Sequence, residues 1–127
     1  MQSDTEVFVG LDTSKLKISV ALAEEGRHGE VRFLGDIENS PDVVRRVVAR
    51  LSGKYRKLSF CYEAGPTGYG LYRQIRDLGH DCSVIAPSLI PKRPGERVKT
   101  NRRDALTLAR LHRAGELTSI SRWGTLE

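Results

Sequence analysis

Three acidic residues in the sequence stand where an active site built from carboxylates is expected. Asp12 ends one apolar segment, Glu63 ends another just before a loop of Gly and Pro, and Asp104 opens a helical segment. If the first and fourth strands are neighbours in a sheet, Asp12 and Glu63 lie close, and a helix start nearby adds Asp104. Clustered carboxylates repel one another unless a cation neutralises them, and hard oxygen ligands suit Mg²⁺ or Mn²⁺. These residues therefore predict a metal site for phosphoryl transfer.

Each of these acids also has a purely structural interpretation. Asp12 precedes two hydroxyl residues and is suited to capping a tight turn, and Glu63 is then an ordinary solvated strand end. Asn101 would be the N-cap of a helix that has Asp104 in its first turn. The metal site is favoured because all three acids fall at the ends of predicted elements.

The elements that position these acids follow from hydrophobic periodicity and turn residues. Strands are predicted over residues 6–12, 16–23, 30–38, 57–63 and 82–86, and helices over 41–52, 69–78 and 102–114. In the second strand Leu16 begins an apolar alternation, and Ser40 with Pro41 opens the first helix. The order βββαβαβα predicts an α/β protein of ribonuclease H-like fold, with a five-stranded mixed sheet and helices on its faces.

The charge of the chain is unevenly distributed. The 127 residues carry a formal net charge of +5, and the whole excess lies in the second half. Such a cluster binds phosphates through charge attraction and counterion release, although a solvated basic face is the plainer interpretation. The residues predicted to contact nucleic acid are Lys15, Lys92, Arg93, Arg97, Lys99, Arg102 and Arg103. The segment 87–99 contains three Pro and one Gly and is predicted to be irregular.

Composition limits the location of the protein. Apolar runs of four residues or fewer exclude a transmembrane helix, which needs roughly 20 apolar residues. Cys61 and Cys82 lack the spacing of a metal site and are too few for a disulfide scaffold. The N-terminus does not resemble a signal peptide, so we expect a cytoplasmic protein with reduced, buried thiols.

Three ordered motifs in the chain resemble the DEDD transposases of the insertion-sequence-110 family. They are VGLDTSK at 9–15, YEAGPTGY at 62–69, and VKTNRRDA at 98–105 followed by LARL at 108–111. The resemblance covers about residues 6–120 and implies a RuvC-like domain over residues 1–120. Residues 121–127 are then the tail of an expressed fragment, and a second domain with a nucleophilic Ser is absent.

The resemblance also implies the ligands of a divalent metal, Mg²⁺ or Mn²⁺. Asp12 matches the first acid of the family motif, Glu63 the second and Asp104 the last. Asn101 stands where the family has its third acid, in a K-T-D-x-x-D-A pattern. An amide oxygen can bind a cation but adds no charge, so the expectation is weaker metal binding, or a helix-capping role for Asn101.

The activity that the resemblance implies is DNA transposition. Family members use a metal site together with a Ser site across subunits, and a bridge RNA selects the DNA. The leading hypothesis is therefore the metal-dependent catalytic domain of a DNA recombinase, with DNA, a structured guide RNA and further copies of the chain as partners and no membrane. The alternative is a non-catalytic module that binds nucleic acid and assembles subunits. A small-molecule hydrolase is less favoured, because no nucleophile–base pair stands out.

Overall fold

The computed structural model describes residues 3–26, 29–64, 69–85 and 101–117. Its elements follow the predicted order of three strands, a helix, a strand, a helix, a strand and a helix. Their bounds are β1 (Ser3–Thr13), β2 (Lys17–Glu24), β3 (Val31–Glu38), α1 (Pro41–Ser52), β4 (Tyr55–Glu63), α2 (Gly70–Asp77), β5 (Asp81–Ile85) and α3 (Asn101–Ala114).

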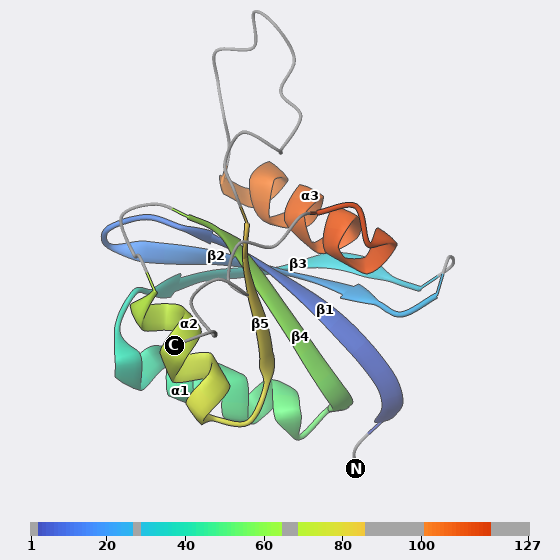
Figure 1. Ribbon diagram of the computed structural model, residues 1–127, viewed down its shortest axis with the longest axis horizontal. Helices are drawn as coiled ribbons and strands as arrows, with labels where there is room; N and C mark the ends of the chain where they lie inside the picture. The colour runs from blue at the N-terminus through green and yellow to red at the C-terminus, as the bar shows by residue number, and fades with distance from the viewer. Residues whose placement is uncertain (1–2, 27–28, 65–68, 86–100, 118–127) are drawn as a thin grey trace, which may run out of the picture.

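The strands form one mixed sheet with the spatial order β3-β2-β1-β4-β5. The pairs β1–β2 and β2–β3 are antiparallel, whereas β1–β4 and β4–β5 are parallel. Figure 1 shows α1 and α2 against one face of this sheet and α3 across the other. The mixed five-stranded sheet and the contact between the first and fourth strands are therefore confirmed.

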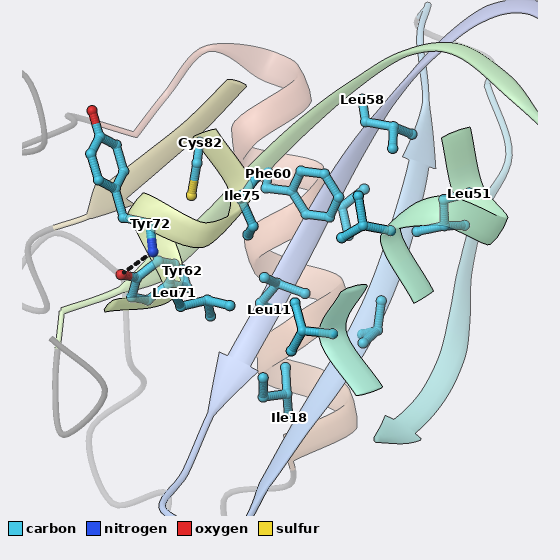
Figure 2. Close-up of a cluster of buried hydrophobic side chains, with 14 of the residues drawn as sticks. Leu11, Ile18, Leu51, Leu58, Phe60, Tyr62, Leu71, Tyr72, Ile75 and Cys82 are labelled. Atoms are coloured by element: carbon cyan, nitrogen blue, oxygen red, sulfur yellow. Dashed lines mark hydrogen bonds between the residues drawn. The ribbon is translucent and has the colours of Figure 1, made fainter. Parts of the chain in front are cut away.

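The two faces of the sheet are packed differently. The face toward α1 and α2 holds the larger core, in which β1 contributes Val7, Val9 and Leu11, all almost fully buried. Figure 2 shows Leu11 in this core together with Phe60 and Ile75. The face toward α3 holds small residues, among them Ala21 and Ala105. Because successive strand residues point to opposite faces, β2 is buried on both sides along most of its length.

Helix α1 begins and ends as the sequence predicts. The Ser40 hydroxyl accepts a hydrogen bond from the Val43 backbone N–H at 3.3 Å, and Pro41 occupies the first turn. Such a cap stabilises a helix by about 1 kcal/mol. Val44 and Val48, one helical turn apart, are buried on the sheet.

Helix α2 is fixed to the end of β4 by a buried tyrosine. The Tyr62 hydroxyl accepts a hydrogen bond from the Tyr72 backbone N–H at 3.1 Å, drawn as the dashed line in Figure 2. Burial raises the pKa of Tyr62, so this phenol stays protonated. Tyr72 packs in the core, whereas Tyr69 remains partly exposed at the helix start.

Two predicted positions differ from the structure in detail. Leu16 belongs to the turn before β2 and is 78% exposed, so it does not continue the buried alternation of that strand. Asn101 is the first residue of α3 and thus lies inside the helix, one position later than an N-cap. The other boundaries either agree or move by at most three residues, as is usual where helices and strands fray.

Both cysteines are buried and unpaired, as the composition predicts. Burial raises the pKa of the Cys82 thiol to about 12 and also raises that of Cys61, so both are unreactive near neutral pH. Within the described ranges, no helix has the length and hydropathy needed to span a membrane.

Candidate metal and nucleic-acid site

Asp12 and Glu63 lie at the C-terminal ends of neighbouring parallel strands, on the same face of the sheet. The last paired residues of β1 and β4 are Leu11 and Tyr62, and both belong to the core under α1 and α2. The next residue of each strand must point the opposite way, toward α3. Asp12 and Glu63 are those residues, and both are half-buried. The strand register therefore positions the two carboxylates side by side.

Helix α3 approaches this face closely because β1 has a glycine beneath it. A Cβ atom built on Gly10 would overlap the Ala105 carbonyl oxygen and lie 2.6 Å from the Ala109 backbone nitrogen. Only a glycine leaves room for backbone so close. Gly10 lies two residues before Asp12 on the same face, and Ala105 follows Asp104 directly. The first turn of α3 thus lies over the strand that ends in Asp12.

The far end of α3 is held by a cation, which sets the direction of the helix across the sheet. The Arg113 guanidinium donates hydrogen bonds of 3.0 Å to the carbonyl oxygens of Glu24 and Gly29, beside the turn between β2 and β3. The first turn, with Asp104, consequently lies toward the opposite edge, where β1 and β4 end (Figure 1). Asp104 is half-buried, and its Oδ2 oxygen is fully buried.

Polar residues lie beside Asp12 on the two neighbouring strands, β2 and β3. Ser19 pairs with Asp12 across β1 and β2, and Asp36 pairs with Ser19 across β2 and β3. The fully buried Ser19 hydroxyl donates a hydrogen bond of 2.6 Å to Asp36 Oδ1. Lys17 Nζ lies 3.4 Å from Asp36 Oδ2. The Ser19 hydrogen bond, helped by Lys17, holds the pKa of Asp36 below its ordinary value.

A bulge in β3 places Asp36 on this face. Phe33 packs toward α3, whereas Ile37 packs against the core under α1, although an even spacing of four residues would keep both on one face. The register shifts between the partners of Val20 and Ala21, so β3 has one extra residue here. Gly35 adopts φ 141° at this point, a conformation that side chains disfavour.

The sequence interpretation therefore missed Ser19, Lys17 and Asp36. Ser19 and Lys17 could have been found, because strand alternation from Asp12 through the antiparallel turn puts them on the same face. Asp36 could not, since its face depends on the bulge.

The ligand chemistry of the acids fits a hard divalent cation. Among the residues that the structure describes, no three His, Cys, Asp or Glu side chains are gathered closely enough to hold a metal ion by themselves. Mg²⁺ keeps several waters and is usually bound by one or two carboxylates together with substrate phosphates. Asp12 and Glu63 supply such carboxylates, and the neighbouring cysteine, Cys61, is buried and protonated.

The predicted nucleic-acid residues are described only in part. Lys15 is exposed on the turn that follows β1. Arg102 and Arg103 lie in the first turn of α3, next to Asn101. The predictions for Lys92, Arg93, Arg97 and Lys99, and for the irregular segment 87–99, lie outside the described residues.

Sequence comparison finds relatives among transposases. The chain is 62% identical over 115 residues to a Sinorhizobium fredii protein named "Putative transposase y4qE", across 91% of the chain. It is 35% identical over 109 residues, 86% of the chain, to the transposase for insertion sequence element IS1533 of Leptospira borgpetersenii. The chain spans about a third of each relative, 30% and 31% of their lengths. No family model matches it.

Comparison of folds finds nucleases. Thermus thermophilus RuvC in complex with a Holliday junction aligns with a TM-score of 0.57 and 12% identity, over 90% of this chain and 99% of that one. RuvC from the same species, in a second structure, gives 0.55 and 14% over the same shares. The large terminase nuclease of phage G20c gives 0.52 and 16%, over 89% of this chain and 57% of that one.

The low sequence identities to the solved nuclease structures establish the fold alone, whereas the higher identities to the two transposases establish common descent. The predicted RuvC-like, ribonuclease H-like architecture is confirmed. The chain is a homologue of insertion-sequence transposases that has the fold of RuvC, consistent with an N-terminal RuvC-like domain of such a transposase.

Proposed function

We propose that the chain is the metal-dependent nuclease domain of a DNA transposase, which cleaves and exchanges DNA strands during transposition. The observation that carries the proposal is the common face of Asp12 and Glu63, with the first turn of α3 lying over the same strand. Transposase relatives and nuclease-fold neighbours support the same reaction class.

Asp12, Glu63 and Asp104 would hold Mg²⁺ or Mn²⁺, and Asn101 would occupy the remaining position of the motif. The bound cation would supply charge stabilisation to a phosphate during strand cleavage. Lys15, Arg102 and Arg103 would hold the nucleic-acid backbone beside the site, together with Lys92, Arg93, Arg97 and Lys99.

The rest of the transposase would complete the reaction. The chain spans about a third of the length of its relatives. We propose that a second domain of the transposase supplies a nucleophilic Ser, that a bridge RNA selects the DNA, and that several copies of the protein assemble for the reaction. DNA is the proposed substrate, and the cytoplasm is the proposed location.

Cleavage of labelled branched DNA and of duplex DNA by the purified chain tests the proposal. We expect nicking in Mg²⁺ or Mn²⁺ and none in EDTA. Asp12→Asn and Glu63→Gln should each lower the rate at least 100-fold, because a removed ligand leaves the phosphate charge uncompensated. Asp77→Asn, which changes an exposed carboxylate at the end of α2, is the matched control and should cleave like the parent.

A second candidate is a binding and assembly module without catalysis. It is favoured by the neutral Asn101 at an acidic position of the motif, and by the lack of a three-carboxylate cluster among the described residues. Salt-sensitive DNA or RNA binding that is equal in EDTA and Mg²⁺, survives Asp12→Asn, and occurs without nicking would support this function over the first.

A further inference from the structure

The turn that joins β1 to β2 is held in one conformation by hydrogen bonds. The backbone N–H of Ser14 donates to the Lys17 carbonyl oxygen at 2.9 Å, and its hydroxyl bonds the same oxygen. Asn39, just before α1, donates from its backbone N–H to the Leu16 oxygen at 3.0 Å and from Nδ2 to the Ser14 oxygen at 2.7 Å. The turn is therefore preorganised, and it follows the strand that carries Asp12 near its end.

This rigid turn carries an unusually exposed apolar side chain. Leu16 is 78% exposed, whereas the next most exposed large apolar residue in the described ranges, Leu34, reaches 40%. A single exposed leucine is unremarkable in itself. Leu16, however, lies between Lys15 and Lys17, both of them exposed. All three follow β1 directly, at the end of the sheet where Asp12 lies. Cations on both sides of an apolar tip match a nucleic-acid strand, which has phosphates on both sides of a base.

Lys17 is positioned to exchange its partner for a phosphate. Its ion pair with Asp36 is 3.4 Å long, and the two side chains are 51% and 43% exposed. Exposed pairs of this kind are weak. Asp36 keeps the 2.6 Å hydrogen bond from Ser19 when Lys17 leaves, so its carboxylate remains satisfied. The lysine can therefore move to a phosphate at little cost.

We propose that the β1–β2 turn is a nucleic-acid contact of the site. In this contact Leu16 lies against a base or sugar, while Lys15 and Lys17 bind the adjoining phosphates and Lys17 gives up Asp36. The inference rests on the proposed function, because it places the turn beside the strand that is cleaved. It adds the apolar contact of Leu16 and the transfer of Lys17 from Asp36 to a phosphate. Neither the VGLDTSK motif nor the net charge of the chain implies these two features.

Binding of fluorescein-labelled branched DNA by the full chain in EDTA, followed by anisotropy over a salt series, tests this contact. Leu16→Ala should weaken binding about tenfold without changing the salt dependence, because an apolar contact is lost. Lys17→Ala should reduce the slope of log K against log salt by about one. Asp36→Asn should strengthen binding at least twofold, since it releases Lys17.

The chain offers matched controls for each variant. Leu34→Ala truncates an exposed leucine on β3, and Lys57→Ala breaks the 3.5 Å ion pair with Asp81 at the opposite edge of the sheet. Both should bind DNA within about twofold of the parent, because neither residue belongs to the β1–β2 turn or takes part in the ion pair of Lys17 with Asp36. Equal melting temperatures of all variants exclude a general loss of folding.

Four results would overturn the inference. Leu16→Ala could bind like Leu34→Ala, or Lys17→Ala could keep the parent's salt slope. Asp36→Asn could weaken binding, which would make the ion pair structural. Leu16→Ala could also change only the oligomeric state, which would assign the turn to a protein partner. If the binding pattern holds but no metal-dependent cleavage occurs, the inference stands and the proposed function fails.

Discussion

The ionisable residues along the α3 face differ in the partners that the fold gives them. Asp36 has a hydroxyl and a lysine, so its pKa is lowered and its contribution to stability is lost only in acid, below its ordinary pKa of 3.8. His112, on α3, is the opposite case. Its Nε2 is buried with no hydrogen-bond partner among the described residues. Its ring packs edge-on against that of Phe8, with 5.3 Å between the two ring centroids. The fold therefore favours the neutral imidazole.

His112 should make stability depend on pH near neutrality. Burial lowers its pKa from the ordinary 6.5, although the charges of Glu6 and Asp81 partly oppose this. As pH falls through 6.5, the unfolded chain takes up the proton first, so the free energy of unfolding decreases. We expect His112→Leu to reduce this decrease, measured by urea unfolding between about pH 7.5 and 5.5.

Part of the pH dependence should survive in that variant. Burial also lowers the pKa of His80, which contributes with the same sign. An identical pH profile for His112→Leu and the parent would show that His112 does not titrate differently in the two states.

At the level of elements, the contact of α3 with β1 decides where Asp104 lies. Ala105 and Ala109 are fully buried over Gly10, so helix and strand meet through small residues and backbone. Interiors are close-packed, and an added methyl group there forces the helix to move. The position of the last motif acid consequently depends on a residue that has no side chain.

Gly10→Ala should destabilise the protein by about 1–3 kcal/mol, because its Cβ would overlap α3. It should also weaken any metal-dependent cleavage, since the first turn of α3 must shift. Gly70→Ala is the matched control, because a Cβ at the first residue of α2 meets nothing within 4 Å. Urea unfolding of both variants measures the difference, and equal stabilities would contradict the close helix–strand contact.

Much of this arrangement could be predicted from local sequence signals. Asp12 and Glu63 end strands whose alternation is plain, and two βα units after a meander imply neighbouring first and fourth strands. The sequence places Leu16 inside the second strand, whereas the structure places it in the preceding turn. Leu16 lies two residues before Ile18 and so fits the alternation of the strand as well as a true strand residue would. The face of Asp36 depends on a bulge, which is a property of strand pairing and leaves only a glycine as its signal.

Across the whole molecule, the two faces of the one sheet are lined by different kinds of side chain. The larger apolar core fills the face under α1 and α2, whereas the face under α3 combines buried alanines and partly buried apolar residues such as Phe33 with the buried Ser19 hydroxyl and the carboxylates. A divalent cation bound on the second face would be specific to the folded chain. Its binding would therefore raise the stability of the molecule as a whole.

Mn²⁺ should raise the melting temperature of the parent and leave that of Asp12→Asn unchanged. A concentration 100-fold above the dissociation constant stabilises by about 2.7 kcal/mol. Asn101→Asp adds a charge at the motif position and should give a larger increase at the same Mn²⁺ concentration. Equal increases for Asn101→Asp and the parent, measured by calorimetry, would place residue 101 outside the coordination sphere.

The bulge in β3 also bears on how the gene can change in length. One codon gained or lost within β1 or β4 would turn Asp12 or Glu63 to the other side of the sheet, while two codons would restore the side. In β3 an extra residue is already built in beside Gly35, so removal of Leu34 would turn the bulge into a regular ladder and leave Asp36 opposite Ser19. Single-codon changes can therefore persist at this bulge and between elements, as at the α1–β4 turn, but within β1 and β4 they must come in pairs or bring their own bulge.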